Sequence, residues 1–398
     1  MVRSYSLIIV GGGIVGMTIA REAAISKKFK KILILEKESS LGAHSSSRNS
    51  GIMHSGFYYA PDSKKASFCS EANRLIRNYC IRNKVKLLKC GKVVVENSEN
   101  ENAVLNQLFD RGKKNGCKIY LYDKKKLNSI EPLAKTKKQF IWSPNTWSAS
   151  PKELIEKLES ELKMRNVEIL IQKKIVKNYN STLIDQHGTK YKYEFVINAA
   201  GGYSLEIAKM MGIQSDLKLL PFKGLYLKSC KKFKGFKTNI YPVPEIDKPF
   251  LGIHTTLTSD FYLKLGPTAL PALSPENYSF FEGIDIKFST PILFNQINLF
   301  INNYFKFREL AFREAKYILK KNIIKEAQKL TNFDLEKIDF EWNSPGIRSQ
   351  LYNSSKQKLE MDFVYKKFKN QFHILNSNSP AWTCSFGTAK FIINTILD

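Results

Sequence analysis

A glycine-rich turn between two apolar segments, close to the start of the sequence, constrains the fold more than any other feature. Residues 7–10 form an unbroken apolar run, residues 11–16 read Gly-Gly-Gly-Ile-Val-Gly, and residues 17–25 place apolar side chains at helical spacing. A second apolar run, residues 32–35, ends in Glu36. This order of strand, glycine turn, helix, strand and acid is typical of a dinucleotide-binding unit built on a parallel sheet.

Each residue type in this turn has a physical reason to be there. Gly11 permits the tight turn, Gly13 lets the backbone approach a pyrophosphate, and Gly16 lets the helix pack against the strand. The N–H groups at the helix start attract phosphates, and Glu36 can accept hydrogen bonds from ribose hydroxyls. An acid at this position disfavours NADP, but it does not separate NAD from FAD. The alternative is a glycine turn that merely connects a strand to a helix.

Composition sets the broad class of protein. A chain of 398 residues with 43% apolar side chains is long enough for two domains with well-filled cores. The six cysteines show no C-x-x-C pair, so we expect reduced thiols in a cytoplasmic protein. The first strand begins almost at Met1, which leaves no room for a signal peptide, and no apolar run reaches the length of a spanning helix.

The net charge of +27 invites a nucleic-acid hypothesis, but the lysines are spread along the whole chain. We therefore expect no nucleic acid as a partner. A positive surface instead favours anionic substrates and anionic membrane surfaces.

The remaining sequence predicts an alternation of strands and helices. Residues 37–50 are rich in serine, and residues 48–59 contain glycines, a histidine and paired tyrosines, which suggests a loop folded against a flat group. The other predicted elements are a helix over 62–82, strands and helices over 91–147, a helix over 150–162, strands over 167–170 and 195–198, mainly β structure over 217–270, mainly helices over 289–330, a strand over 373–376 and a helix over 386–396.

Several motifs, taken in order, resemble one known family. They are residues 44–59, 221–224, 241–244, 249–254, 265–267, 346–350 and 378–381. On these residues the chain resembles the L-2-hydroxyglutarate oxidase/dehydrogenase family within the FAD-dependent, D-amino-acid-oxidase-like superfamily, from Ile8 to the last helix. Two departures stand out: Lys223-Gly224-Leu225 replaces the usual Arg-Gly-Glu, and Trp382 and Cys384 replace smaller residues in the closing loop.

The resemblance implies an α/β fold with a Rossmann-like FAD-binding domain and a mixed-sheet α+β substrate domain. The expected FAD domain is discontinuous, over residues 1–90, 148–215 and 345–398, and the expected substrate domain covers 91–147 and 216–344. The implied activity is oxidation of an L-2-hydroxy acid, most typically L-2-hydroxyglutarate to 2-oxoglutarate, by hydride transfer to flavin N5. FAD would be held without a covalent tether, and the electron acceptor would be oxygen or a membrane quinone.

Candidate catalytic and substrate-binding residues follow from the chemistry of this reaction, which needs a base for the hydroxyl proton and cations for the carboxylates. His54 and His254 are the candidate bases, and Arg348 is the preferred carboxylate partner because a guanidinium binds a carboxylate in a bidentate manner. Which histidine is the base stays open, and for each residue a purely structural role is the alternative. The candidate substrate-binding residues are Tyr58, Tyr59, Lys223 and Tyr241.

The resemblance also implies a set of cofactor-binding residues, and no metal. They are Gly11, Gly13, Ile14, Val15, Gly16, Glu36, Lys37, His44, Ser45, Ser46, Arg48, Asn49, Ser50, Gly51, Ala200, Gly201, Gly346, Ser379, Pro380 and Ala381. The N-terminus of the last helix could face the flavin and stabilise negative charge on the reduced ring.

Two alternative functions and one undecided segment remain. The scaffold would also suit an amine or amino-acid oxidase of the glycine- or sarcosine-oxidase type, or an FAD-containing protein that binds nucleic acid. Residues 291–321 mix phenylalanines with lysines and arginines. They form either a helical hairpin packed on the substrate domain or a basic, aromatic face that docks on the inner face of a membrane.

Overall fold

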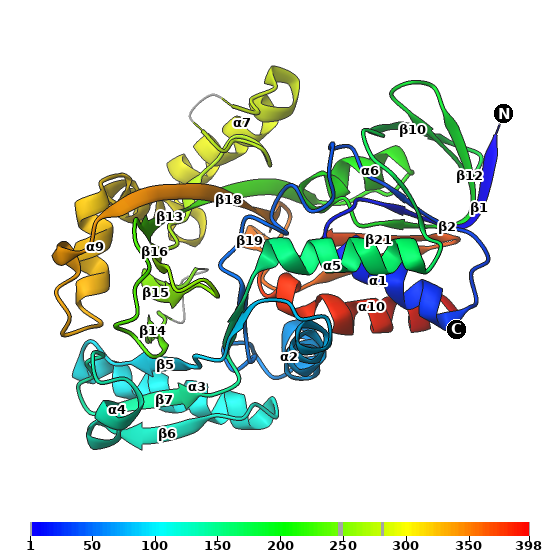
Figure 1. The fold of residues 1–398 in the computed structure, drawn as a ribbon. Coiled ribbons are helices and arrows are strands. Elements are labelled where there is room, and N and C mark those ends of the chain that lie inside the picture. Colours follow the sequence, from blue (N-terminus) through cyan, green and yellow to red (C-terminus); the bar gives the residue numbers. More distant parts are fainter. Residues whose placement is uncertain (1, 246–249, 280–281, 398) are drawn as a thin grey trace. The chain divides into compact units, whose positions relative to one another are not determined.

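The computed structural model describes residues 2–245, 250–279 and 282–397, so Pro249 of the predicted motif lies outside the described residues. The chain divides into two compact units (Figure 1). The first unit comprises Met1–Arg48, Pro151–Pro221 and Arg348–Asp398, and the second unit comprises Asn49–Ser150 and Phe222–Ile347.

The first unit is built on a parallel sheet with the strand order β21-β12-β1-β2-β9. Strands β10, β11 and β20 add antiparallel pairs at its edges. The elements are β1 (Arg3–Val10), α1 (Ile14–Ser26), β2 (Ile32–Leu35), α5 (Pro151–Met164), β9 (Glu168–Leu170), β10 (Ile175–Tyr179), β11 (Thr182–Asp185), β12 (Lys190–Asn198), α6 (Ser204–Met210), β19 (Lys358–Leu359), β20 (Val364–Phe368), β21 (Gln371–Asn376) and α10 (Ala381–Leu397).

Strand β1 is buried on both faces, which explains its continuous apolar run. On one face Ile8 and Val10 pack in a cluster with Ile207 of α6. On the other face α1 approaches so closely that Gly16 lies against Ile9. A parallel sheet covered by helices on both faces is the arrangement that the sequence predicts, and it is confirmed.

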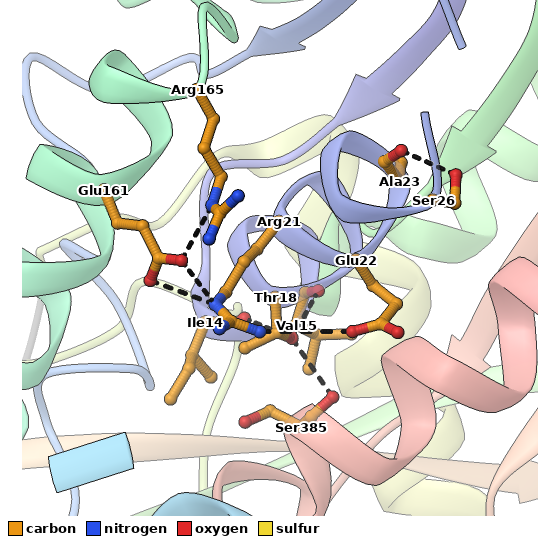
Figure 2. Close-up of polar contacts among 10 residues, drawn as sticks. All are labelled: Ile14, Val15, Thr18, Arg21, Glu22, Ala23, Ser26, Glu161, Arg165 and Ser385. Carbon is orange, nitrogen blue, oxygen red and sulfur yellow. Dashed lines mark hydrogen bonds and ion pairs between the residues drawn. The ribbon is translucent and has the colours of Figure 1, made fainter. Parts of the chain in front are cut away.

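Three helices of the first unit are joined by polar contacts along α1 (Figure 2). Arg21 of α1 donates from Nε to both carboxylate oxygens of Glu161 in α5, at 2.9 and 3.0 Å. The hydroxyl of Thr18 lies 3.1 Å from the carbonyl oxygen of Ser385 in α10, and Thr18 is buried. These contacts fix the start of α1 against the start of the last helix.

The second unit carries a mixed sheet with the order β18-β13-β16-β15-β14-β5-β7-β6, and a small sheet β3-β8-β4. Its elements are β3 (Ile52–Met53), α2 (Lys64–Arg82), β4 (Leu87–Leu88), β5 (Lys92–Val95), α3 (Asn102–Lys114), β6 (Tyr120–Asp123), α4 (Lys124–Ile130), β7 (Gln139–Ser143), β8 (Trp147–Ala149), β14 (Asn239–Pro242), β15 (His254–Leu257), β16 (Leu263–Gly266), β17 (Leu270–Pro271), α7 (Ile286–Asn302), α8 (Phe307–Ala315) and α9 (Lys320–Gln328). Strands β13 (Leu217–Ser229) and β18 (Phe340–Asn353) each have residues in both units.

The two faces of this mixed sheet pack against different cores. Val93 and Ile240 belong to one cluster, which includes Ile323 of α9. Val94 and Tyr241, one residue further along each strand, belong to a second cluster. Because side chains alternate across a strand, the face that carries Val94 and Tyr241 also carries the first residue of β5.

Segment 49–90, expected in the FAD domain, groups instead with the second unit. The reason is strand pairing: β3 and β4 both pair with β8, and α2 packs on β3. The last helix begins at Ala381, five residues before the predicted start at 386. Residues 289–330 fold mainly as helices, as predicted, and among the described residues no helix is long and apolar enough to cross a membrane.

We predict that Gly16→Ala destabilises the protein more than an alanine elsewhere would. A Cβ atom at Gly16 would overlap the carbonyl oxygen of Gly11, which is backbone and cannot rotate away. The expected loss in the free energy of unfolding is about 3 kcal/mol. The matched control is Gly188→Ala, where φ is +81° but no atom lies within 4 Å of the added Cβ, so the expected loss is about 1 kcal/mol. Urea unfolding measures both values, and equal losses would contradict the packing argument.

Candidate active site

The glycine turn and Glu36 form the centre of a dinucleotide site in the first unit. Gly11 has φ of +111°, and a Cβ there would overlap the backbone of Ala199, so two chain segments meet closely at this point. The buried carboxylate of Glu36 accepts hydrogen bonds from the N–H groups of Gly12, at 2.7 Å, and Glu38, at 2.8 Å. The acid is therefore fixed beside the turn, as a ribose-binding acid must be.

The serine-rich loop folds back over the start of α1. Ser46 accepts a hydrogen bond from the N–H of Ile14 at 2.9 Å, and thereby caps the helix N-terminus. His44 Nε2 lies 2.9 Å from a carboxylate oxygen of Glu38, which Lys37 also contacts. Although burial opposes it, hydrogen bonds and charge interactions with Lys37 and His44 lower the pKa of the Glu38 carboxyl. Of the predicted cofactor residues, Lys37, His44 and Ser46 thus lie in one polar cluster around the turn.

The other predicted cofactor segments of the first unit also lie at the carboxyl ends of strands. Ala200 and Gly201 follow β12, and the N–H of Ala200 donates to the side chain of Asn198. Ser379 and Pro380 come between β21 and α10, and Ala381 is the first residue of α10. Because β1, β12 and β21 are parallel, these ends share one edge of the sheet.

The two candidate histidines lie in the second unit, as do all three predicted tyrosines. His254, the first residue of β15, stacks on the ring of Tyr241 with 3.7 Å between the ring centroids. Its Nδ1 lies 2.8 Å from the carbonyl oxygen of Gly252. An Nδ1–H donated to this carbonyl makes Nε2 the basic nitrogen of the neutral ring.

The His54 loop is anchored from two sides by groups that bond its backbone. The side-chain amide of Asn73 donates to the carbonyls of Met53 and His54. The thiols of Cys69 and Cys117 donate to the carbonyls of His54 and Ser55, respectively. The loop is therefore held in place, as a loop carrying a catalytic group must be.

A buried lysine completes this group of residues. Lys92 is 0% exposed, and its ammonium lies 4.4 to 4.6 Å from the ring centroids of Phe57, Tyr58 and Tyr241. Its Nζ donates to the hydroxyl of Tyr58 at 3.3 Å. Within the described residues no carboxylate pairs with Lys92. We call Phe57, Tyr58 and Tyr241 the aromatic cage.

Burial and mutual repulsion shift the pKa values in this group. Burial, with a smaller contribution from Lys92 and His254, lowers the pKa of His54 to about 3. Burial lowers the pKa of Lys92 to about 7. It also raises the pKa values of Tyr58 and Tyr241, so both phenols stay protonated. At neutral pH the cluster thus contains a neutral His54 imidazole, two phenols and a lysine near its titration point.

The other predicted catalytic and substrate-binding residues, Tyr59, Lys223 and Arg348, make different contacts. Tyr59 accepts a hydrogen bond on its carbonyl from Asn115 and lies under the ammonium of Lys65. Lys223 donates to the carbonyl of Ser279 at 2.9 Å, and burial lowers its pKa. Arg348 lies in β18 at the start of the third segment of the first unit.

The remaining predicted cofactor residues are distributed between the units. Ile14, Val15, Ser45 and Arg48 belong to the first unit, and Asn49, Ser50, Gly51 and Gly346 belong to the second. Their contacts with a cofactor stay a prediction.

Sequence reasoning missed Lys92. The run Lys92-Val93-Val94-Val95 predicts a strand, and it is one, but a lysine at the start of a strand is normally solvated. The one local hint in the sequence is Gly91, which directly precedes the lysine. In the structure all four residues of β5 are buried, and the sequence does not reveal this for Lys92. Burial of Lys92 results from the pairing of β5 with β14 and β7, which are distant in sequence.

Comparison with known proteins identifies the family. Residues 6–395 match the model of the family described as FAD dependent oxidoreductase. A mitochondrial L-2-hydroxyglutarate dehydrogenase from Caenorhabditis briggsae is 32% identical over 98% of this chain and 92% of that protein. An L-2-hydroxyglutarate dehydrogenase from Escherichia coli is 28% identical over 98% and 93%, respectively.

Solved structures show the same fold. An L-α-glycerophosphate oxidase from Mycoplasma pneumoniae, with FAD bound, gives a TM-score of 0.75 at 18% identity, over 100% of this chain and 95% of that one. A glycine oxidase from Geobacillus kaustophilus gives 0.74 at 15% identity, over 99% and 95%.

The cradle in the first unit fits a flavin dinucleotide. Added Cβ atoms at Gly11 and Gly16 would overlap backbone, the helix N-terminus follows directly, and the Glu36 carboxylate is fixed beside the turn. The fold and the cofactor expected from the sequence are confirmed. The chain belongs to the family of FAD-dependent oxidoreductases.

Proposed function

We propose that this protein oxidises L-2-hydroxyglutarate to 2-oxoglutarate. Full-length similarity to proteins named L-2-hydroxyglutarate dehydrogenase, in animals and bacteria, supports the substrate. The single structural observation that carries the reaction type is the cluster in the second unit, where an imidazole with a basic Nε2 is stacked on a phenol. Bound FAD supplies the hydride acceptor for such an oxidation.

His254 is the proposed base. The hydrogen bond from Nδ1 to the Gly252 carbonyl orients the ring, so that Nε2 accepts the proton of the substrate's hydroxyl group. Stacking on Tyr241 fixes the plane of the imidazole. His54 is the second candidate, and burial lowers its pKa to about 3, which makes its imidazole a weak base.

Arg348 and Lys223 are the proposed partners of the two substrate carboxylates. A guanidinium gives planar, bidentate binding, whereas an ammonium acts as a point charge. Lys223 stands where the related family has arginine, so we infer that one carboxylate is held by a single charged hydrogen bond in this protein. Tyr58 and Tyr241 stay protonated and can donate hydrogen bonds to substrate oxygens.

The direct test is anaerobic reduction of the flavin. L-2-Hydroxyglutarate is expected to bleach the FAD absorbance of the purified holoenzyme, whereas glycine, sarcosine and L-proline leave it unchanged. His254→Gln, which keeps a polar side chain but removes the base, is expected to slow bleaching at least about 100-fold with FAD still bound.

The matched control is His187→Gln, which changes an exposed histidine in the turn between β11 and β12 and should bleach at the wild-type rate. Bleaching by an amino acid and not by any 2-hydroxy acid would show that the protein is an amine oxidase. An unchanged rate in His254→Gln would show that His254 is structural.

We further propose that the protein passes its electrons to a membrane quinone, while docked peripherally on the inner face of the membrane. Support comes from helix α7, which exposes six large apolar side chains to solvent at helical spacing, beside the polar Lys287, Thr290, Asn298 and Asn302. The six apolar residues are Ile286, Leu293, Phe294, Ile297, Phe300 and Ile301, and we call them the α7 face. Phe294 and Ile301 are 66% and 68% exposed.

Cations surround the α7 face, and α7 itself contains no acid. Arg308 lies 6.0 Å from the ring of Phe300, and Lys287, Lys306 and Lys316 are exposed nearby in sequence. An apolar face flanked by basic side chains matches the interface of a membrane with anionic lipids. Soluble oxygen as the acceptor is the alternative outcome.

We predict that the protein sediments with vesicles that contain phosphatidylglycerol and not with phosphatidylcholine vesicles. The double variant Phe294→Ser/Ile301→Ser removes two apolar side chains from the α7 face and should weaken vesicle binding about tenfold or more. The control is Met164→Ser, which changes an apolar residue that is 77% exposed at the end of α5 and should bind like the wild type. Equal binding by all three proteins, or none by the wild type, would contradict membrane docking through α7.

A further inference from the structure

The buried ammonium of Lys92 has no role in the reaction as described so far. It is enclosed by the aromatic cage, its one hydrogen bond within the described residues goes to the hydroxyl of Tyr58, and no carboxylate there compensates its charge. Cation–π contacts replace only part of the hydration that an ammonium loses on burial. A buried ammonium without a counter-charge lowers the free energy of unfolding unless the lysine can release its proton. Residues with such a cost are often found at functional sites, which favours a role for Lys92 in the reaction.

The position of Lys92 couples it to both candidate bases. Its ammonium and the imidazole of His254 both contact the ring of Tyr241, at 4.6 and 3.7 Å from the ring centroid. Its positive charge also opposes protonation of His54. Two positive charges inside one apolar cluster repel each other strongly, because water does not screen them there.

Within the described part of the chain, the titratable groups that act on the cluster come from several elements. They are Tyr58 and His54 from the loop after β3, Cys69 from α2, Cys90 from the segment before β5, Lys92 from the start of β5, Cys117 from the turn after α3, Tyr226 from β13, Tyr241 from β14 and His254 from β15. The phenols and thiols whose pKa values are raised, among them Tyr58, Tyr241, Cys90 and Cys117, are neutral at physiological pH. The number of protons that the cluster holds therefore depends on Lys92, His54 and His254.

We propose that Lys92 is a positioning residue for proton removal: its amine and the imidazoles of His54 and His254 together hold no more than one proton, and the proton that a histidine takes from the substrate's hydroxyl group comes to rest on Lys92. This inference rests on the proposed function. Before the reaction the lysine is a neutral amine, and afterwards it is an ammonium. Bound FAD would accept the hydride from the substrate carbon, and the proton would leave Lys92 for solvent before the next turnover, so that atoms and charge balance.

The proposal predicts how pH controls the rate. Burial lowers the pKa of Lys92 to about 7, so below that pH the amine already carries the proton and cannot accept another. Flavin reduction in the wild type should therefore accelerate as the pH rises through about 7. Burial keeps His54 neutral in the range in which a free imidazole would titrate, and the charge of Lys92 adds a smaller contribution wherever the lysine is protonated.

The test uses Lys92→Met, which has nearly the same shape but no charge, in the full-length holoenzyme. Replacing a buried charge by an apolar side chain is expected to leave the fold intact, which near-UV circular dichroism checks. NMR titration of the histidines, of which the chain has five, should show a raised pKa for His54 in this variant. The rate of flavin reduction should lose its rise near pH 7 and fall about tenfold or more at pH 8.

Two further variants separate the effect of the charge of Lys92 from the effect of its ability to accept a proton. Lys92→Arg keeps a permanent charge, so His54 should stay neutral as in the wild type while the rise near pH 7 disappears. Lys31→Met removes a lysine that lies 4.5 Å from the ring centroid of Tyr5 in the first unit, and it should change neither the titration nor the pH profile. An unchanged His54 titration and an unchanged rise near pH 7 in Lys92→Met would overturn the proposal. The histidine titration needs no substrate. It therefore tests the coupling between Lys92 and His54 even if L-2-hydroxyglutarate does not reduce the flavin.

Discussion

The contact between α1 and β1 at Gly16 is the constraint on which the first unit depends. Without a Cβ at this position the helix lies against the backbone of Gly11, and the helix N-terminus comes next to the carboxyl end of β1. The same close approach fixes Gly12 beside the carboxylate of Glu36 and brings α10 into contact with α1 through Thr18. One packing contact therefore sets the geometry of the whole dinucleotide cradle.

The second unit obtains its site in a different way, from the alternation of side chains along paired strands. Lys92 of β5, Tyr241 of β14 and His254 of β15 come from neighbouring strands and share one face, while Val93 and Ile240 fill the core on the other face. A shift of one residue in the pairing of β5 with β14 would turn Lys92 away from Tyr241. Sheet register thus controls which charges meet in the cluster.

Local signals in the sequence predict much of the first unit and little of the cluster. The glycine turn, the buried strand and Glu36 are close in sequence, so their arrangement follows from spacing alone, and the structure has the tight turn with the Glu36 carboxylate beside it. His254 and Tyr241 were both candidate site residues from the sequence. Their stacking could not be predicted, because it depends on which strands pair. Lys92 could not be predicted, because its burial depends on β14 and on the loop that carries Phe57 and Tyr58. Segment 49–90 groups with the second unit for a similar reason, since β3 pairs with the distant β8.

The cluster in the second unit is the proposed binding site for the substrate. The most direct measurement is the NMR spectrum of the histidine side chains in the oxidised holoenzyme, with and without 2-oxoglutarate, after assignment by single substitutions of the five histidines. The account predicts that the imidazole signals of His54 and His254 shift on saturation, while the signal of the exposed His187 does not. Saturable binding of 2-oxoglutarate without any change at His54 and His254 would contradict it.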